Sequence, residues 1–351
     1  MNDDLIWLFP LLYIILFFIV YIFMKLYIKY AEVHKIYSHP SSRSAHNKAI
    51  PTGGGVVFGS LCLVFLLLSM IGVDEIVIKY SILKICFGAF FILLLGMIDD
   101  RYVVSAKYKL FIQVMIASMM YFFGFQISYM TNPFGLPIDF SFLSFPITIV
   151  WYLLVMNAIN FIDGLDGLSS GITIIACLVL MVFSYFSRNF LVFLNCSMLV
   201  VCLLAFLRYN FFPAKVFMGD TGSLFIGFML ASLSVAGNEE QFKGLTTFTL
   251  LVPLTVILIP LSDTVFTVFR RIKSKQNIFK ADKNHIHHKL IDFGLSHRTV
   301  TLICWLITLF LGLIALGYLF VNTEIMFLVL IIIGIITLGL FFYIYKKELF
   351  K

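Results

Sequence analysis

The sequence predicts an all-α integral membrane protein that crosses the bilayer about eleven times, and two observations carry this prediction. Of the 351 residues, 61% are hydrophobic and only 12% are charged, whereas soluble domains carry about 25% charged residues. Apolar runs near the length of about 20 residues that a membrane helix needs follow one another along the chain. No long hydrophilic stretch separates them, so we expect one transmembrane domain over residues 1–351.

The expected spans follow from these apolar runs in chain order. The first run has no basic segment before it, as a cleavable signal peptide would, and should remain as a membrane helix. The six cysteines lie in apolar runs without metal-binding or paired spacing, so we interpret them as small hydrophobic residues. The eleven spans are expected near residues 5–25, 55–73, 80–98, 108–125, 145–162, 170–187, 190–207, 223–237, 247–269, 300–321 and 325–345.

The basic residues indicate how these spans are oriented. With the N-terminus outside and the C-terminus in the cytoplasm, all of the 25 Lys and Arg fall on the cytoplasmic side except Lys79, Lys84, Arg188 and Lys243. Cytoplasmic loops of membrane proteins carry such an excess of basic residues. The same bias accounts for the net charge of +7 without a nucleic-acid partner.

A polar stretch stands out at the cytoplasmic end of the fifth span. It reads Asn157-Ala-Ile-Asn-Phe-Ile-Asp-Gly-Leu-Asp-Gly-Leu-Ser-Ser-Gly171, with Asn160, Asp163 and Asp166 continuing the three-residue spacing from Asn157. Each step of three drifts about 60° around a helix, so the first three polar residues can share one face. The glycines between the acids can bend the chain and bring Asp166 back toward that site. A hydrated turn alone would need only a Gly and one or two polar residues.

Two acidic motifs fall on the same predicted face. Gly96-Met-Ile-Asp-Asp-Arg-Tyr102 places Asp99 and Asp100 at the end of the third span, where they suit a Mg²⁺ ion or form a plain interfacial stop. Arg208-Tyr-Asn-Phe-Phe-Pro-Ala-Lys-Val-Phe-Met-Gly-Asp-Thr-Gly-Ser223 is predicted as a loop that carries Asp220 between two glycines. A structural reentrant turn would not need that acid.

Two cytoplasmic loops add histidines and basic residues. Asp282-Lys-Asn-His-Ile-His-His-Lys289 could hold a transition metal or an anionic diphosphate, and both interpretations stay open. Arg43-Ser-Ala-His-Asn-Lys-Ala-Ile-Pro-Thr-Gly-Gly-Gly55 ends in glycines whose N–H groups could meet a phosphate, with Lys48 adding charge. Gly55 and Gly59 equally form a small-xxx-small pair suited to helix packing.

Acidic and basic groups on one membrane face predict phosphoryl transfer. An acidic cluster repels an anionic substrate, but a divalent cation reverses that sign, and positioning and electrostatics then supply most of the catalysis. A secondary transporter also has intramembrane acids and broken helices, but near the midplane, and no inverted repeat is evident here. A non-catalytic scaffold would be expected to lose acids that this chain retains.

At these motifs the sequence resembles the polyprenyl-phosphate N-acetylhexosamine-1-phosphate transferase family. The resemblance runs from Arg43 to Arg298, and its motifs are Asp99-Asp100, Asn160-Phe-Ile-Asp-Gly-Leu-Asp-Gly-Leu168, Pro213-Ala-Lys-Val-Phe-Met-Gly-Asp-Thr-Gly-Ser223 and His285-Ile-His-His288. The histidine motif and Gly294-Leu-Ser-His-Arg298 look closer to the N-acetylglucosamine-1-phosphate branch than to the muramoyl-pentapeptide branch. The latter has an unbroken histidine triplet, which Ile286 interrupts here.

This resemblance implies transfer of a sugar-1-phosphate from a UDP-N-acetylhexosamine to undecaprenyl phosphate, with release of UMP. N-acetylglucosamine-1-phosphate is the expected group, transferred in the first membrane step of cell-envelope polysaccharide, lipopolysaccharide or teichoic acid synthesis. The implied cofactor is Mg²⁺, with Mn²⁺ as an alternative. The implied setting is the bacterial cytoplasmic (inner) membrane, with the active site facing the cytoplasm and a homodimer as one expected assembly.

The resemblance also implies roles for individual residues. Asp220 matches the main Mg²⁺ ligand, and Asp99 the group that deprotonates the lipid phosphate, with direct attack favoured over a covalent Asp intermediate. The implied metal ligands are Asp99, Asp100, Asp163 and Asp220, which form the implied catalytic set together with His287. The implied substrate contacts are Lys48, Asn160, Asp166, Asn210, Phe217 (on uracil), His285, His288 and one or both of Arg270 and Arg271.

The ninth span is expected to be bent. It contains Pro253 and Pro260, with Asp263 seven residues before Arg270. Proline removes a backbone donor and bends a helix. We therefore expect a kinked helix beside a groove for the lipid substrate.

Overall fold

A computed structural model describes residues 8–38, 49–130, 138–236, 251–273, 286–321 and 323–349. Helices build nearly all of this part of the chain, and the only strands described form two short antiparallel ladders. The helices are α1 (Leu8–Val33), α2 (Gly55–Ser69), α3 (Ile76–Tyr102), α4 (Ala106–Phe122), α5 (Ser144–Ile162), α6 (Leu168–Phe186), α7 (Phe190–Asn210), α8 (Gly219–Val235), α9 (Leu251–Val256), α10 (Leu258–Lys273), α11 (Ile286–Asp292), α12 (His297–Leu316) and α13 (Thr323–Leu349). Short 3-10 turns are η2 (Met70–Gly72), η3 (Ser141–Leu143) and η6 (Gly317–Leu319), and the strand pairs are β1 (Tyr37–Ser38) with β2 (Ile50–Pro51) and β3 (Tyr129–Met130) with β4 (Ile138–Asp139).

Each of the eleven expected spans contains helix. Among the described residues, seven segments are long and apolar enough to cross a membrane by length and composition: α1, α2 with η2, α3, η3 with α5, α6, α7 and α12. The other four expected spans correspond to α4 and α8, which have 17 residues each, to the interrupted α9–α10 pair, and to α13, which has 27 residues. The prediction of an all-α, multi-pass membrane protein is confirmed, while the number eleven and the orientation in the membrane stay predictions.

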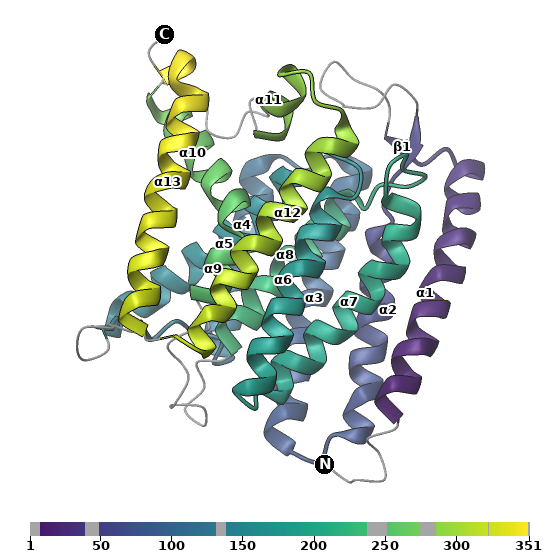
Figure 1. Ribbon diagram of the computed structural model, residues 1–351. Coiled ribbons are helices and arrows are strands. Elements are labelled where there is room, and N and C mark those ends of the chain that lie inside the picture. The colour runs from purple at the N-terminus through teal and green to yellow at the C-terminus, as the bar shows by residue number, and fades with distance from the viewer. Residues whose placement is uncertain are drawn as a thin grey trace.

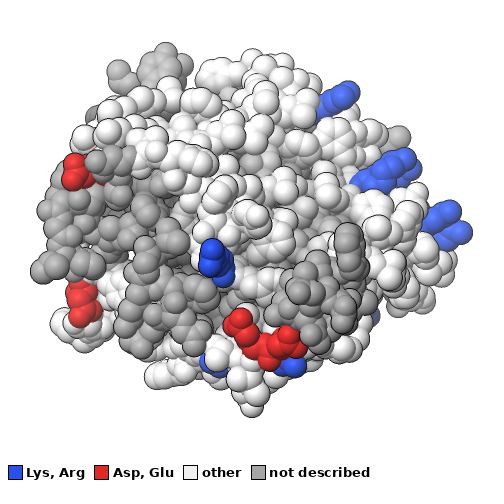
Figure 2. Space-filling view, turned by 60° about the horizontal axis from the view of Figure 1, so that its bottom comes forward, with Lys and Arg blue, Asp and Glu red and all other residues white. Residues whose placement is uncertain are grey.

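The helices run up and down a single bundle (Figure 1). α1 begins at the bottom of this view and α13 ends at the top. β1 and α11 also lie at the upper end. The face seen in Figure 2, in which the bottom of the bundle comes forward, is mostly uncharged over the residues it describes, with a few scattered acidic and basic side chains. The described candidate residues lie at or next to the ends of α3, α5, α7 and α10 and the start of α8, and these ends point to the upper end of the bundle in Figure 1.

The core is centred on α8. From Thr221 to Val235 every residue of this helix is buried, and a helix that is apolar all round is stable only inside a protein or a membrane. It packs against α2, α3 and α5. A Cβ atom on Gly55 of α2 would collide with the backbone of Gly222, and one on Gly96 of α3 with that of Thr221. These contacts fix the first turn of α8 in place.

The expected kink in the ninth span is present as a break between α9 and α10 at Ile257. Pro260 has no N–H to donate, and the helical pattern resumes with Leu261 N donating to Ile257 O at 3.1 Å. The hydroxyl of Thr264 in turn donates to Pro260 O at 3.0 Å. The lipid groove beside this helix stays a prediction.

Candidate active site

Two of the predicted acids meet at the upper end of the bundle around a lysine. The Lys109 ammonium lies 2.8 Å from Asp99 Oδ2 and 2.9 Å from Asp220 Oδ2. On the other side of Asp220, Asn160 Nδ2 donates to Asp220 Oδ1 at 2.5 Å and to Ser223 Oγ at 2.8 Å. Four helices, α3, α4, α5 and α8, thus bring their polar side chains to one point.

Lys109 was not among the residues predicted for the site, because its charge was used only to orient the spans in the membrane. Its position follows from the hairpin between α3 and α4, whose connection covers only residues 103–105. Asp99 lies in the last turn of α3 and Lys109 in the first turn of α4, so antiparallel packing sets them at the same height. Opposite charges at matching distances from a short turn are the signal that could have identified the pair.

Asp100 holds the N-terminus of α8. Its Oδ1 accepts from Asp220 N at 2.7 Å, and its Oδ2 accepts from Thr221 Oγ1 at 2.6 Å and Thr221 N at 3.2 Å. A carboxylate on the free N–H groups of a first helical turn is favourable both as a cap and against the helix dipole. Gly219, with φ of +72°, leaves room for this carboxylate, because any Cβ there would collide with it.

The same contacts correct one expectation about Asp220. The apolar pattern predicted a loop there, ahead of an eighth span at 223–237, but Asp220 lies in the first turn of α8, which starts at Gly219. The apolar run that starts at residue 223 shows where the apolar part of the span begins, and not where the helix begins. The polar first turn is helical because Asp100 caps it from another helix, which no local pattern shows.

The Asn–Asp stretch divides between two places. Asn157 turns toward α4, where its Nδ2 donates to Gln113 Oε1 at 2.9 Å, while Asn160 reaches Asp220. Asp163 directly follows α5, and its Oδ1 accepts from Ser169 Oγ at 2.5 Å. The expected shared face therefore holds only in part.

Asp163 is a half-buried acid with other carboxylates near it. Burial raises the pKa of its carboxyl to about 7; the hydrogen bond from Ser169 lowers that pKa, while the neighbouring carboxylates raise it. Those neighbours are Asp220, Asp100 and Asp166. A nearby cation would favour the ionised form of Asp163 and move its pKa down again.

Asp166 and Asn210 hold the loops together. Asp166 Oδ2 accepts from Ala214 N at 2.8 Å. Asn210 is buried, with Oδ1 accepting from Gly167 N and Ser170 Oγ at 3.1 Å each and Nδ2 donating to Val216 O at 2.9 Å. Gly167 has φ of +72°, so the bend expected at a glycine is present. Both residues join the 163–170 turn to the 214–216 segment, and their predicted substrate contacts stay predictions.

The glycine loop is packed by its backbone. Gly54 N donates to Phe217 O and Gly55 N to Met218 O, both at 2.9 Å, and Phe217 N donates to Pro51 O at 2.8 Å. These N–H groups are used within the protein, so of the two interpretations of this loop the structure favours close helix packing. Phe217, half-buried, is held by these bonds next to the site.

The remaining candidates lie on the same end of the bundle or outside the described residues. Arg270 and Arg271 are buried near the end of α10, which packs on α5. Lys48 and His285 lie outside the described residues, as do the side chains of His287 and His288 in α11. Figure 1 shows α11 at the top of the bundle.

The described residues fit a magnesium ion bound with few protein ligands. Among them, no group of three His, Cys, Asp or Glu side chains is close enough to hold a metal. Mg²⁺ commonly binds through one or two carboxylates plus water and substrate phosphate. Asp99 and Asp220 supply two carboxylates that already share a cation, the Lys109 ammonium.

Fold and site together define a class, a multi-pass α-helical membrane protein with an acidic and basic centre at one end of its bundle. Sequence comparison identifies the family within this class. Residues 82–238 match the model of glycosyl transferase family 4. With the relatives described next, this shows that the chain belongs to the polyprenyl-phosphate N-acetylhexosamine-1-phosphate transferase family.

Three relatives illustrate the range of this family. A probable undecaprenyl-phosphate N-acetylglucosaminyl 1-phosphate transferase of Bacillus subtilis is 38% identical over 269 residues, 76% of this chain and 73% of its own length. A decaprenyl-phosphate N-acetylglucosaminephosphotransferase of Mycobacterium leprae is 32% identical, covering 80% and 75%. A phospho-N-acetylmuramoyl-pentapeptide-transferase of Staphylococcus epidermidis is 31% identical, covering 76% and 84%.

Proposed function

We propose that this protein is a Mg²⁺-dependent transferase that moves N-acetylglucosamine-1-phosphate from a UDP-sugar to undecaprenyl phosphate and releases UMP. The observation that carries the proposal is the meeting of Asp99, Lys109, Asn160 and Asp220 from four helices at one end of a membrane bundle. With a divalent cation bound, such a centre could neutralise phosphates at the end of the bundle, where a lipid head group would lie. A transporter site would be expected nearer the midplane of the bundle.

The chain's own residues divide the work of the proposed reaction. Asp220 and Asp99 would hold Mg²⁺, which when bound neutralises phosphate charge and orients the two phosphates for direct attack. Asp99 would accept the proton of the lipid phosphate, and Lys109, already in contact with both carboxylates, would turn to a phosphate oxygen. Phe217 would pack on uracil, and the histidines of α11 and its approach would contact the diphosphate.

The choice of N-acetylglucosamine rests on two supporting observations. Ile286 interrupts the histidine triplet, and the relative named for N-acetylglucosaminyl transfer is 38% identical, against 31% for the one named for muramoyl-pentapeptide transfer. The latter still covers 76% of this chain, so a muramoyl-pentapeptide donor is the second candidate.

A donor competition assay tests the proposal. Purified protein in nanodiscs receives undecaprenyl phosphate, Mg²⁺ and one radiolabelled donor at a time: UDP-N-acetylglucosamine, UDP-N-acetylgalactosamine or UDP-N-acetylmuramoyl-pentapeptide. We expect organic-extractable label with the first donor and loss of that signal with EDTA. Label transferred only from the muramoyl donor would replace the sugar assignment. No transfer from any donor by folded protein would remove the transferase proposal.

A further inference from the structure

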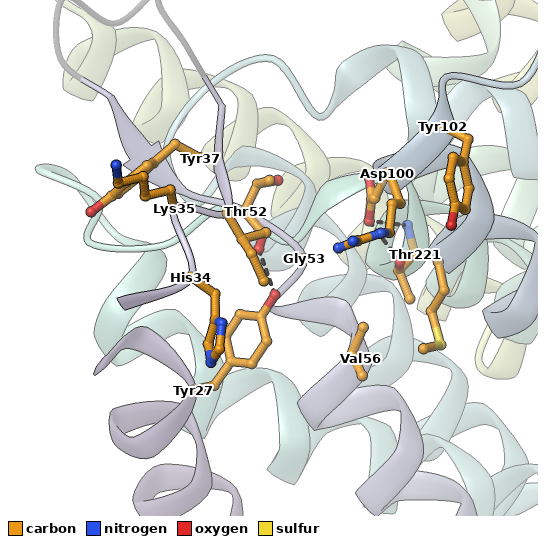
Figure 3. A pocket seen from close by; sticks show the side chains of 13 residues that line it. Tyr27, His34, Lys35, Tyr37, Thr52, Gly53, Val56, Asp100, Tyr102 and Thr221 are labelled. Atoms are coloured by element: carbon orange, nitrogen blue, oxygen red, sulfur yellow. Dashed lines mark hydrogen bonds between the residues drawn. The ribbon is translucent and has the colours of Figure 1, made fainter. Parts of the chain in front are cut away.

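A cavity lies beside the carboxylate centre. It has a volume of about 490 Å³ and lies between the end of α1 and the end of α3, over the start of α2. Figure 3 shows Tyr27, His34 and Tyr37 on one side, and Asp100, Tyr102 and Thr221 on the other. Its lining shares Asp100 with the candidate active site but does not include Asp99, Lys109, Asn160 or Asp220, so the cavity opens beside the carboxylate centre and not into it.

The cavity is framed by the end of α1, the loop and first turn of α2, and the end of α3. Tyr27 Oη donates to Thr52 O at 2.7 Å and ties α1 to the loop before α2. Gly53, with φ of +86°, lets that loop pass so close to the tyrosine that a Cβ would fall 2.6 Å from its hydroxyl oxygen. Gly53 and Val56 form the floor between the two walls (Figure 3).

The charge of the lining favours an anion. Lys35 and Arg101 line the cavity together with His34, whose ring lies 4.2 Å from that of Tyr30. Within the described part of the chain, neither Lys35 nor Arg101 forms an ion pair with a carboxylate. The one acid in the lining, Asp100, has both oxygens engaged by the first turn of α8.

The position of the cavity favours a lipid as the source of that anion. The membrane-length segments of α1 and α3 end at Val33 and Tyr102, so the basic groups lie where the spans meet the head-group region. Large apolar side chains continue outside the cavity, with exposed fractions of 76% for Val33 and 50% for Ile98. Juxtamembrane Lys and Arg beside apolar surface are typical of sites for anionic lipids.

We propose that this cavity binds the phosphate head group of an anionic phospholipid, with Lys35 and Arg101 on the phosphate and the tyrosine hydroxyls near the polar head group. The bound lipid lies against Asp100 and Thr221, the two residues that hold the start of α8, and so adjoins the carboxylate centre without entering it. This inference does not depend on the reaction proposed above, because it concerns binding alone.

Lipid titration followed by native mass spectrometry tests the proposal. The full-length protein in neutral detergent is titrated with phosphatidylglycerol or phosphatidylcholine, as wild type, as Lys35→Gln with Arg101→Gln, and as Lys25→Gln with Lys29→Gln. The two double variants remove the same charge, and Lys25 and Lys29 are exposed on α1 but do not line the cavity.

We expect phosphatidylglycerol affinity to fall about 10-fold or more in the Lys35–Arg101 variant, since each direct charge-assisted contact to the phosphate adds roughly tenfold. The Lys25–Lys29 variant should retain most of the affinity, and phosphatidylcholine should bind weakly throughout. Equal losses in both variants would indicate diffuse surface attraction and overturn the proposal. Displacement of phosphatidylglycerol by inorganic phosphate or UMP would assign the cavity to a soluble anion, and selective displacement by undecaprenyl phosphate would assign it to the acceptor substrate.

Discussion

Asp220→Asn is expected to lower turnover by about 10²–10³-fold, the effect of losing one strong electrostatic contact to a transition state. The substitution keeps the shape of the side chain and the Asp100 cap on its backbone N–H. It removes the charge that faces Lys109 and the proposed Mg²⁺. Turnover at saturating donor, together with the Mg²⁺ concentration that gives half-maximal rate, measures both parts of the effect.

Asp292→Asn is the matched control for this variant. Asp292 ends α11 at the same end of the bundle and is exposed, so its loss changes the net charge equally without touching the centre. We expect this control to keep wild-type turnover. Wild-type turnover in folded Asp220→Asn protein would instead remove Asp220 from the proposed metal site.

Gly55→Ala is expected to destabilise the protein by disrupting the packing of α2 against α8. The added Cβ would collide with the backbone of Gly222. A backbone segment inside a packed helix cannot move aside as the end of a flexible side chain could. Overpacking of this kind destabilises by about 1–3 kcal/mol and sometimes more, and here it would push on the first turn of α8 that carries Asp220. Thermal unfolding in detergent and the yield of monodisperse protein measure the loss, and activity should fall with them.

Gly334→Ala separates this effect from a change in helix propensity. Gly334 lies in α13, and a Cβ there would meet nothing within 4 Å. In the interior of α13 the substitution gains about 1 kcal/mol of intrinsic helix propensity, so the control should unfold at the wild-type temperature or above it. Equal stability of the two alanine variants would show that α2 and α8 do not approach as closely as described.

The fold could be predicted from the sequence because membrane spans are coded locally. Each run of about 20 apolar residues satisfies its own backbone hydrogen bonds as a helix, so every expected span contains one. The break at Ile257 was also predictable, since Pro260 lacks its donor whatever its surroundings. The start of α8 was not, because the cap that makes its first turn helical comes from Asp100, more than a hundred residues earlier.

The candidate site was predicted as a set of residue types, and less well as a set of contacts. Spacing and resemblance pointed to Asp99, Asn160 and Asp220, which the structure brings together. Asp166 and Asn210 were expected at the substrate, yet their side chains bond to backbone groups of neighbouring loops and, for Asn210, to the Ser170 hydroxyl of α6. A polar residue near a ligand and one that clamps a loop look alike in sequence, because both need only hydrogen-bonding atoms at a turn.

Reversal of the reaction tests the central claim most directly. The proposed transfer exchanges one diphosphate for another, so it should run backward with UMP. Protein in nanodiscs, given undecaprenyl-diphosphate-N-acetylglucosamine, Mg²⁺ and labelled UMP, should form labelled UDP-N-acetylglucosamine. EDTA should stop the exchange, and Phe217→Ala should weaken the use of UMP by removing a stacking surface for uracil. Absence of labelled nucleotide sugar, with protein shown to be folded and with each candidate lipid-linked sugar supplied, would contradict the assignment of this chain as a sugar-1-phosphate transferase.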